Sequence, residues 1–304
     1  MPSPDARFYL SALPMLDAAQ VAAARNLEAV IELYGAFPDT IDYQACFDRD
    51  IAVLATGPGM KTSVAEMALA MALSSARGLV QEHELFRRNE EHWLNDNPRS
   101  DFTMYGARVG IVGLGSIARE ICRLLAPFAP KIIAYDPYVD PAVAADLGVT
   151  LVTLEEVAAN SRCLFITAVP TKTNRGLVTR DIFARIPTGG LVVLVSRAYV
   201  VDFDALVDEV RSGRLRAAID VFPVEPPAPD HVIRSLPNVT LSPHRAAAIS
   251  GGRQLMGHYI VEDIARMIAG DAPRDLQRAT PERVLDLAGV QHSKKLEDMA
   301  EERE

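Results

Sequence analysis

The sequence predicts an α/β protein whose larger part is a doubly wound parallel sheet, joined to a second, smaller lobe. From Ala107 onward, short β-branched apolar runs alternate with segments of the right length for crossover helices. Most of these runs are apolar at nearly every position, which is typical of strands covered on both faces. The chain has 304 residues, 49% of them hydrophobic, so it is long enough for two domains with a core each.

The segment before residue 64 is expected to form the smaller lobe. It contains an alanine-rich stretch at residues 18–24 and two strand-like runs at residues 29–33 and 51–55. Because two strands do not make a self-sufficient sheet, we expect this lobe to be incomplete.

A long apolar helix is predicted next, over residues 63–79, continuing into the charged stretch 81–91. Its Ala, Met and Leu residues are more numerous than one core-facing stripe requires. We therefore expect it to lie between domains and, near Met67 and Met71, between the subunits of a homodimer. Burial within one chain is the alternative.

The larger domain is predicted to span residues 64–246, and its elements follow in order. The expected strands are residues 109–112, 131–135, 149–152, 163–169, 191–195, 217–221 and 239–241. The expected crossover helices are residues 116–125, 141–147, 154–160, 180–184 and 203–212. A later helix, residues 250–268, would return the chain to the smaller lobe, which then comprises residues 1–63 and 247–304, with a frayed charged tail at 291–304.

Composition excludes several classes of function. The chain has 31 Lys and Arg against 40 Asp and Glu, a formal charge of −9, which argues against a nucleic-acid partner. No apolar run reaches the roughly 18 residues of a membrane span, and residues 1–8 do not resemble a signal peptide. Cys46, Cys122 and Cys163 are far apart and lack metal-ligand spacing, so we expect buried free thiols, no metal and a cytoplasmic location.

A glycine-rich turn is the first sign of a binding site. Gly113 and Gly115 directly follow the first strand of the larger domain, and Ala118 takes the place of a third glycine. In this motif the first glycine permits a tight turn and the second lets the backbone approach a pyrophosphate. The N–H groups that open the next helix, at Ser116 and Ile117, would favour the anion. The motif predicts a Rossmann-type nucleotide site.

Asp136 strengthens this interpretation because it ends the next strand, 23 positions after Gly113. A carboxylate there can accept both ribose hydroxyls of an adenosine and would repel a 2′-phosphate, which favours NAD over NADP. A plain strand-turn-helix and a site for S-adenosylmethionine are the two alternatives.

The ends of the later strands favour hydride transfer. Arg197, Asp220 with Glu225, and His244 each emerge where an apolar strand ends, and ligands of open α/β sheets collect at those ends. A guanidinium can bind a carboxylate and polarise a carbonyl, and an imidazole can exchange a proton with the substrate oxygen. A carboxylate bonded to the imidazole would keep it protonated. A methyltransferase needs no such set.

With these residues, the sequence resembles the D-isomer-specific 2-hydroxyacid dehydrogenases, a family that also includes corepressor proteins. The matching segments are residues 64–70, 110–118, 135–138, 196–198, 218–226 and 241–244, in family order, within a weaker match over residues 35–267. The resemblance implies NAD as cofactor, a small 2-hydroxy or 2-oxo acid as substrate, a homodimer, and a flavodoxin-like fold for the smaller lobe.

The resemblance also implies roles for individual residues. Arg197 would bind the substrate, Glu225 would be the carboxylate partner, and His244 would be the acid and base. Asp220 would touch the nicotinamide amide and Asp136 the adenosine ribose, with Pro170 in a loop against the cofactor. The backbone of Gly35, Ala36 and Phe37 would hold the substrate carboxylate.

Several positions depart from the family pattern. Leu194 replaces the usual Asn, a bulky Tyr199 lies near Arg197, the loop 170–176 is one residue shorter, and Phe37 replaces a glycine. The part before Gly35 is shorter than the family's first lobe, so we expect either an open substrate cleft with weak turnover or a misplaced start. We expect an enzyme that acts on an acid such as glyoxylate or hydroxypyruvate. The alternatives are an NAD(H)-binding regulatory protein and a catalytically impaired homologue.

Overall fold

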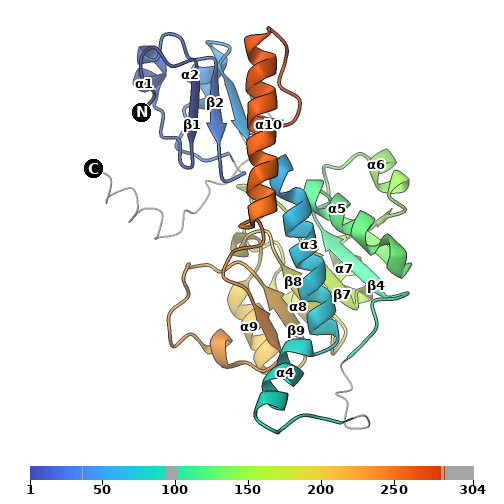
Figure 1. The fold of residues 1–304 in the computed structure, drawn as a ribbon. Coiled ribbons are helices and arrows are strands. Elements are labelled where there is room, and N and C mark those ends of the chain that lie inside the picture. The colour runs from blue at the N-terminus through green and yellow to red at the C-terminus, as the bar shows by residue number, and fades with distance from the viewer. Residues whose placement is uncertain (36, 94–100, 282–283, 285–304) are drawn as a thin grey trace. The chain divides into compact units, whose positions relative to one another are not determined.

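The computed structural model describes residues 1–35, 37–93, 101–281 and 284 of the chain (Figure 1). Within them the chain divides into two compact units. The first unit contains Met1–Thr62, Pro170–Thr173 and the described residues from Ala247 onward, and the second contains Ser63–Val169 and Asn174–Ala246.

The second unit is built on a seven-stranded sheet in which all strands are parallel. The strand order is β10-β9-β8-β7-β4-β5-β6. The strands are β4 (Arg108–Val112), β5 (Lys131–Tyr135), β6 (Thr150–Leu151), β7 (Cys163–Ile166), β8 (Leu191–Leu194), β9 (Arg216–Ile219) and β10 (Val239–Leu241). The predicted doubly wound α/β architecture is confirmed.

Helices connect these strands, and several begin at a side-chain cap. They are α5 (Ser116–Leu125), α6 (Pro141–Asp146), α7 (Leu154–Asn160), α8 (Arg180–Arg185) and α9 (Phe203–Arg211), with the 3₁₀ turns η2 (Ala126–Phe128), η3 (Ala198–Val200) and η4 (Val232–Ser235). Asp140, Thr153, Thr179 and Asp202 each accept a backbone N–H of the following helix. Such caps satisfy N–H groups that have no partner inside the helix.

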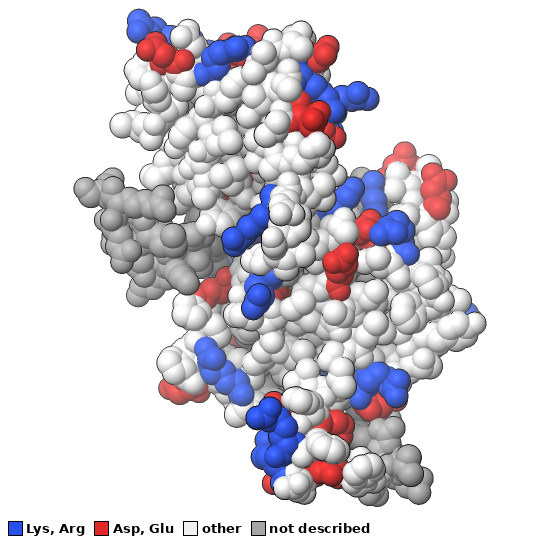
Figure 2. Space-filling model, viewed as in Figure 1, with Lys and Arg blue, Asp and Glu red and all other residues white. Residues whose placement is uncertain are grey.

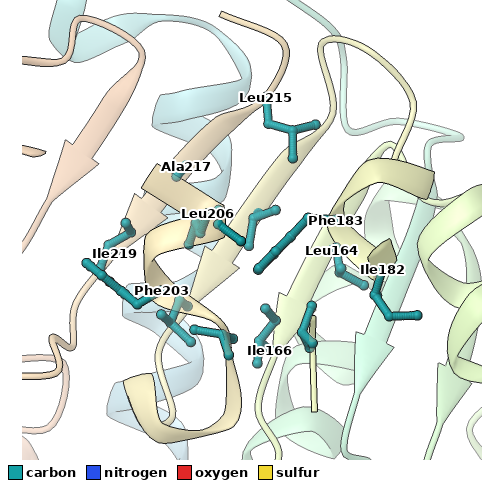
Figure 3. Packing of buried hydrophobic residues seen from close by; sticks show 14 of the residues in the cluster. Leu164, Ile166, Ile182, Phe183, Phe203, Leu206, Leu215, Ala217 and Ile219 are labelled. Carbon is teal, nitrogen blue, oxygen red and sulfur yellow. The ribbon is translucent and has the colours of Figure 1, made fainter. Parts of the chain in front are cut away.

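The strands are buried on both faces, which explains their continuous apolar sequence. Alternate residues such as Leu164, Ile166 and Ile219 point to the side of α7, α8 and α9, where they pack with Phe183 and Leu206 (Figure 3). Their neighbours along the strands, including Cys163, Phe165 and Val193, are also fully buried. A strand of this kind has no solvent face, so no polar alternation marks it.

The first unit contains a four-stranded sheet in the order β1-β2-β3-β11. Its elements are β1 (Phe8–Ser11), α1 (Ala18–Ala23), β2 (Ala29–Glu32), α2 (Tyr43–Phe47), β3 (Ala52–Ala55), α10 (Ser250–Ile268) and β11 (Gln277–Arg278). α1 and α2 cover one face of the sheet, and α10 covers the other with Tyr259, Ile260, Ile264 and Met267. The expectation of only two strands was wrong, because β1 and the antiparallel β11 complete the sheet.

The predicted long helix is two helices. α3 (Gly57–Ala76) begins six residues earlier than expected, because Pro58 is tolerated in a first helical turn. Gly78 adopts a left-handed φ of 60° between α3 and α4 (Leu79–Arg87), and the two helices are bent by 59°. Within the described residues no single helix is long and apolar enough to span a membrane, and only the length and composition of the bent pair α3 and α4 taken together would be sufficient.

All three cysteines are buried free thiols, Cys46 in the first unit and Cys122 and Cys163 in the second. On the face that Figure 2 presents, acidic and basic side chains are interspersed. The charged tail, residues 291–304, lies outside the described residues.

Candidate active site

The glycine turn lies between β4 and α5. Its two glycines, Gly113 and Gly115, are needed for different reasons. Gly113 has a φ of +90°, and a Cβ atom there would lie 2.4 Å from the Cα of Ala168. The fold itself therefore requires glycine at this position. Gly115 precedes α5 with a φ of −75°, and among the described residues a Cβ atom there would meet nothing within 4 Å. The space beside Gly115 is open to a ligand.

Asp136 lies against this turn from the end of β5. Its Oδ2 accepts the N–H of Leu114 at 2.7 Å, and its Oδ1 accepts those of Tyr138 at 2.9 Å and Val139 at 3.1 Å. A carboxylate beside a glycine turn and a free helix N-terminus is the donor and acceptor set that the adenosine ribose and pyrophosphate of a dinucleotide require. These residues fit that cofactor.

Thr167 also holds the turn, and sequence reasoning missed it. Its Oγ1 donates to the carbonyl of Gly113 at 2.7 Å, and the residue is 4% exposed. The sequence does mark this residue, since Thr167 is the first polar residue after the apolar strand β7.

His244 and Glu225 form a pair in the connections around β10. Nδ1 of His244 lies 2.5 Å from Oε2 of Glu225, and Oε1 of Glu225 accepts the N–H of Phe222 at 2.9 Å. An ionised carboxylate can only accept, so the hydrogen belongs on Nδ1 of His244. That arrangement leaves Nε2 as the ring nitrogen available to a substrate.

The electrostatics of Glu225 bring Arg197 into the same group. Burial of the Glu225 carboxyl by itself raises its pKa, but the bonds from His244 and Phe222 and the charges of His244 and Arg197 outweigh burial and hold the pKa below its usual range. Three side chains that are up to 47 positions apart in the chain therefore act on one another. They come from the ends of β8 and β9 and from the segment after β10.

Arg197 directly precedes the turn η3 and is half-buried. Its Nη1 donates to the carbonyl of Ser196 at 2.8 Å. We expected the bulky side chain of Tyr199 to lie near this arginine. The guanidinium of Arg175 lies over the Tyr199 ring, 5.7 Å from its centroid. The Tyr199 carbonyl accepts the N–H of Gly176 at 2.9 Å. These contacts tie the arginine turn to the loop after β7.

Asp220 is 1% exposed at the end of β9. Its Oδ1 accepts the N–H of Arg245 at 3.0 Å, and its Oδ2 accepts that of Ala246 at 3.2 Å. Both carboxyl oxygens thus face the segment that carries His244. This arrangement was not expected from the sequence.

The remaining candidate residues belong to the first unit. Gly35 has a φ of +80° and lies so close to the start of α3 that a Cβ atom would be 2.9 Å from Sδ of Met60. Phe37 is 5% exposed and packs in the core with residues of α1 and α2, so its side chain is not available to a substrate. Pro170 is half-buried, and Ala36 lies outside the described residues.

Comparison with known families gives one match, over residues 69–246, to the family described as D-isomer specific 2-hydroxyacid dehydrogenase, NAD binding domain. D-3-phosphoglycerate dehydrogenase of Mycobacterium leprae is 31% identical over 279 residues, which cover 88% of this chain and 52% of that protein. Hydroxypyruvate reductase of Thermotoga maritima is 32% identical over 248 residues, 80% of this chain and 78% of that protein. The chain spans about half the length of the phosphoglycerate dehydrogenases that it matches.

Solved structures show the same architecture. A phosphoglycerate oxidoreductase from Rhizobium etli superposes with a TM-score of 0.80 and 33% sequence identity, covering 92% of this chain and 85% of that chain. The family match, residues 69–246, spans the positions of the glycine turn, Asp136, Arg197, Glu225 and His244.

Proposed function

The chain belongs to the D-isomer specific 2-hydroxyacid dehydrogenase family and carries its NAD-binding domain, and we propose that it is an NAD-dependent oxidoreductase of a small D-2-hydroxy acid. In the reverse direction it would reduce the corresponding 2-oxo acid. The observation that carries this proposal is the 2.5 Å pair of His244 and Glu225, with the charge of Arg197 acting on the same carboxylate.

Each of the three side chains has a role in this reaction. The Arg197 guanidinium would bind the substrate carboxylate and polarise the 2-oxo group. His244 would donate a proton from Nε2 to the 2-oxo oxygen, which becomes a hydroxyl. Glu225 is ionised because its pKa is lowered, and it would stabilise the protonated imidazole before this transfer. When bound, NADH supplies the hydride to the 2-carbon of the acid.

The cofactor would be held by residues of the second unit together with Pro170. The N–H groups of Ser116 and Ile117 would face the pyrophosphate beside Gly115, where open space remains. Asp136 would accept the ribose hydroxyls and exclude a 2′-phosphate. The backbone of the Gly35 to Phe37 loop would provide N–H groups for the substrate carboxylate.

Glyoxylate and hydroxypyruvate are the substrates we propose. A relative that shares 32% of its aligned residues is named hydroxypyruvate reductase. Tyr199, fixed by Arg175, adds bulk next to Arg197 and favours a small acid. The relatives named D-3-phosphoglycerate dehydrogenase make a phosphorylated acid a useful comparison substrate.

We also propose a cytoplasmic homodimer that associates through α3 and α4. A shallow depression there is lined by Ala70, Leu73, Ser74, Arg77 and Leu79. Leu79 and Phe86 of α4 are large apolar side chains that are 62% and 59% exposed. The buried free thiols suit a reducing compartment. Sedimentation of the wild type and of Leu73→Glu would test the dimer.

The test of the function is a fluorescence titration with NADH followed by a panel of glyoxylate, hydroxypyruvate, pyruvate and 3-phosphohydroxypyruvate on the same preparation. We expect NADH binding and oxidation with at least one non-phosphorylated acid. Tight NADH binding without turnover of any acid would contradict the proposal and favour an NAD(H)-binding regulatory protein.

A further inference from the structure

Three consecutive backbone N–H groups, those of His244, Arg245 and Ala246, converge on one residue, Asp220. The N–H of His244 donates to the Asp220 carbonyl at 2.8 Å. The next two N–H groups donate to the two carboxyl oxygens, at 3.0 and 3.2 Å. Successive N–H groups that point to one centre form a concave anion site, and here the anion is a side chain of the protein.

The backbone of His244 itself is in a conformation that L residues rarely adopt. Its φ is +48°, in the left-handed region. A residue persists there only when its surroundings determine the conformation. The three bonds to Asp220 begin at His244 and include both following residues, so they fix the chain on the C-terminal side of this left-handed position.

The partner of the imidazole is anchored to the same strand end. Oε1 of Glu225 accepts the N–H of Phe222, two residues after Asp220, while Oε2 meets Nδ1 of His244. The end of β9 therefore holds both members of the pair, the carboxylate through Phe222 and the imidazole-bearing backbone through Asp220.

Resting on the proposed function, we propose that Asp220 is the positioning residue of the acid and base: its carboxylate sets the left-handed backbone of His244 and so directs the imidazole to Glu225. Both oxygens are used in this task, and the side chain is 1% exposed. The proposal differs from a contact between Asp220 and the nicotinamide amide, because it requires the carboxylate even when no cofactor is bound.

Asp220→Asn tests whether the two acceptor oxygens of the carboxylate are required. It keeps the size of the side chain but replaces one acceptor oxygen with an NH₂ group, which would oppose the N–H of Arg245 or Ala246. We expect kcat with the best acid of the panel to fall by about tenfold to a hundredfold, as for a displaced catalytic group. We expect the NADH dissociation constant to stay within about twofold. Asp208→Asn, at a half-exposed carboxylate paired with Arg180, is the matched control and should change neither quantity.

A double-mutant cycle separates the two roles. If Asp220 acts through His244, then Asp220→Asn should cause no further loss of kcat in a His244→Ala background. Multiplicative losses in the double variant, or weaker NADH binding with an unchanged kcat, would overturn the proposal.

Amide hydrogen exchange tests the inference without activity. In the cofactor-free protein, Asp220→Asn should make the amides of Arg245 and Ala246, which donate to the Asp220 side chain, exchange faster by about tenfold, the change that follows from losing roughly one hydrogen bond. Unchanged exchange would overturn the proposal even if the enzyme is active. Conversely, Asp220→Asn could speed up exchange while the wild type fails to oxidise NADH with any acid of the panel. That result would support the contact between Asp220 and the His244 segment and would contradict the proposed function.

Discussion

Glu225 stays ionised beside His244 although its side chain is only 19% exposed. Burial raises the pKa of this carboxyl, yet the net direction is downward, because the imidazole lies at 2.5 Å and the N–H of Phe222 at 2.9 Å. An ionised carboxylate therefore faces Nδ1 of His244 and holds the imidazole in place.

The lowered pKa of Glu225 predicts a pH-dependent contribution to stability. A carboxyl whose pKa is lower in the folded state stabilises the fold above its unfolded pKa, near 4.3, and loses that contribution as the pH falls through the folded value. In urea unfolding, Glu225→Gln should be less stable than the wild type at about pH 6 to 7, and the difference should shrink below about pH 4. A difference that is constant with pH would show that the ionised form is not the stabilising one.

His244→Ala should remove the proton donor without affecting cofactor binding. We expect kcat to fall by about 10² to 10⁴, the usual contribution of a general acid or base, with NADH affinity unchanged. His83→Ala, at an exposed position of α4, is the control and should retain full activity. A His244→Ala enzyme with wild-type kcat would exclude His244 from the reaction.

The two glycines of the turn should respond differently to alanine. Gly113→Ala should destabilise the protein strongly, because the added Cβ would lie 2.4 Å from the Cα of Ala168 and the φ is +90°. Gly115→Ala should have the unfolding temperature of the wild type, since its Cβ meets nothing within 4 Å among the described residues. It should bind NADH more weakly, because the added Cβ would occupy the space proposed for the pyrophosphate. Thermal unfolding and NADH titration of both variants give the comparison, and equal NADH affinity of Gly115→Ala and wild type would contradict a pyrophosphate at Gly115.

Asp136→Ala should weaken NADH binding and relax discrimination against NADPH. The carboxylate is within 2.7 Å of the Leu114 N–H, in position to accept ribose hydroxyls and to repel a 2′-phosphate. The ratio of the two dissociation constants is the measurement. Asp140→Ala, at the cap of α6, controls for a general loss of structure, and an unaltered ratio in Asp136→Ala would refute the ribose contact.

The ion pair of Arg216 and Asp101 predicts an effect on stability. Their ion pair, at 2.9 Å, is almost buried, with side chains 9% and 11% exposed, and Arg216 also donates to the carbonyl of Ser75. Asp101→Ala would leave a buried guanidinium without its carboxylate, which costs about 3 kcal/mol or more of unfolding free energy. Glu90→Ala, in the exposed pair with Arg88, should change that free energy little.

The sequence predicted the second unit well because its elements have strong local signals. The helices α5 and α7 and the strands β5 and β10 have the expected bounds, as does α10 of the first unit. Most other strands differ at one end, by one to three residues; β7, for example, ends at Ile166 rather than at residue 169. An apolar run continues past the last ladder bond, so composition alone does not mark the end of a strand.

The missed elements lack such signals. β11 has only two residues, the polar Gln277 and Arg278, and it exists through antiparallel pairing with β3. α2 is five residues long and rests on the Asp42 cap. Pairing and packing over long sequence distances decide such elements, and a local pattern does not report them.

In the candidate site, too, some features could be predicted from the sequence and others could not. Residue types at strand ends predicted Arg197, Glu225 and His244, which the fold brings together. The bonds of Asp220 to Arg245 and Ala246, and the core position of Phe37, depend on side-chain directions that no spacing rule gives. The roles assigned to these residues stay predictions until the variants are measured.

The buried thiols make the chain a convenient background for spectroscopic labels. Burial raises the pKa of Cys46 and of Cys122 to about 11, and it raises that of the fully buried Cys163 further. At neutral pH only about one in 10⁴ of the first two groups is a thiolate, the nucleophilic form that attacks maleimides and oxidants. A single cysteine introduced at an exposed site would therefore take up a fluorophore or spin label selectively, with no need to replace the three native residues.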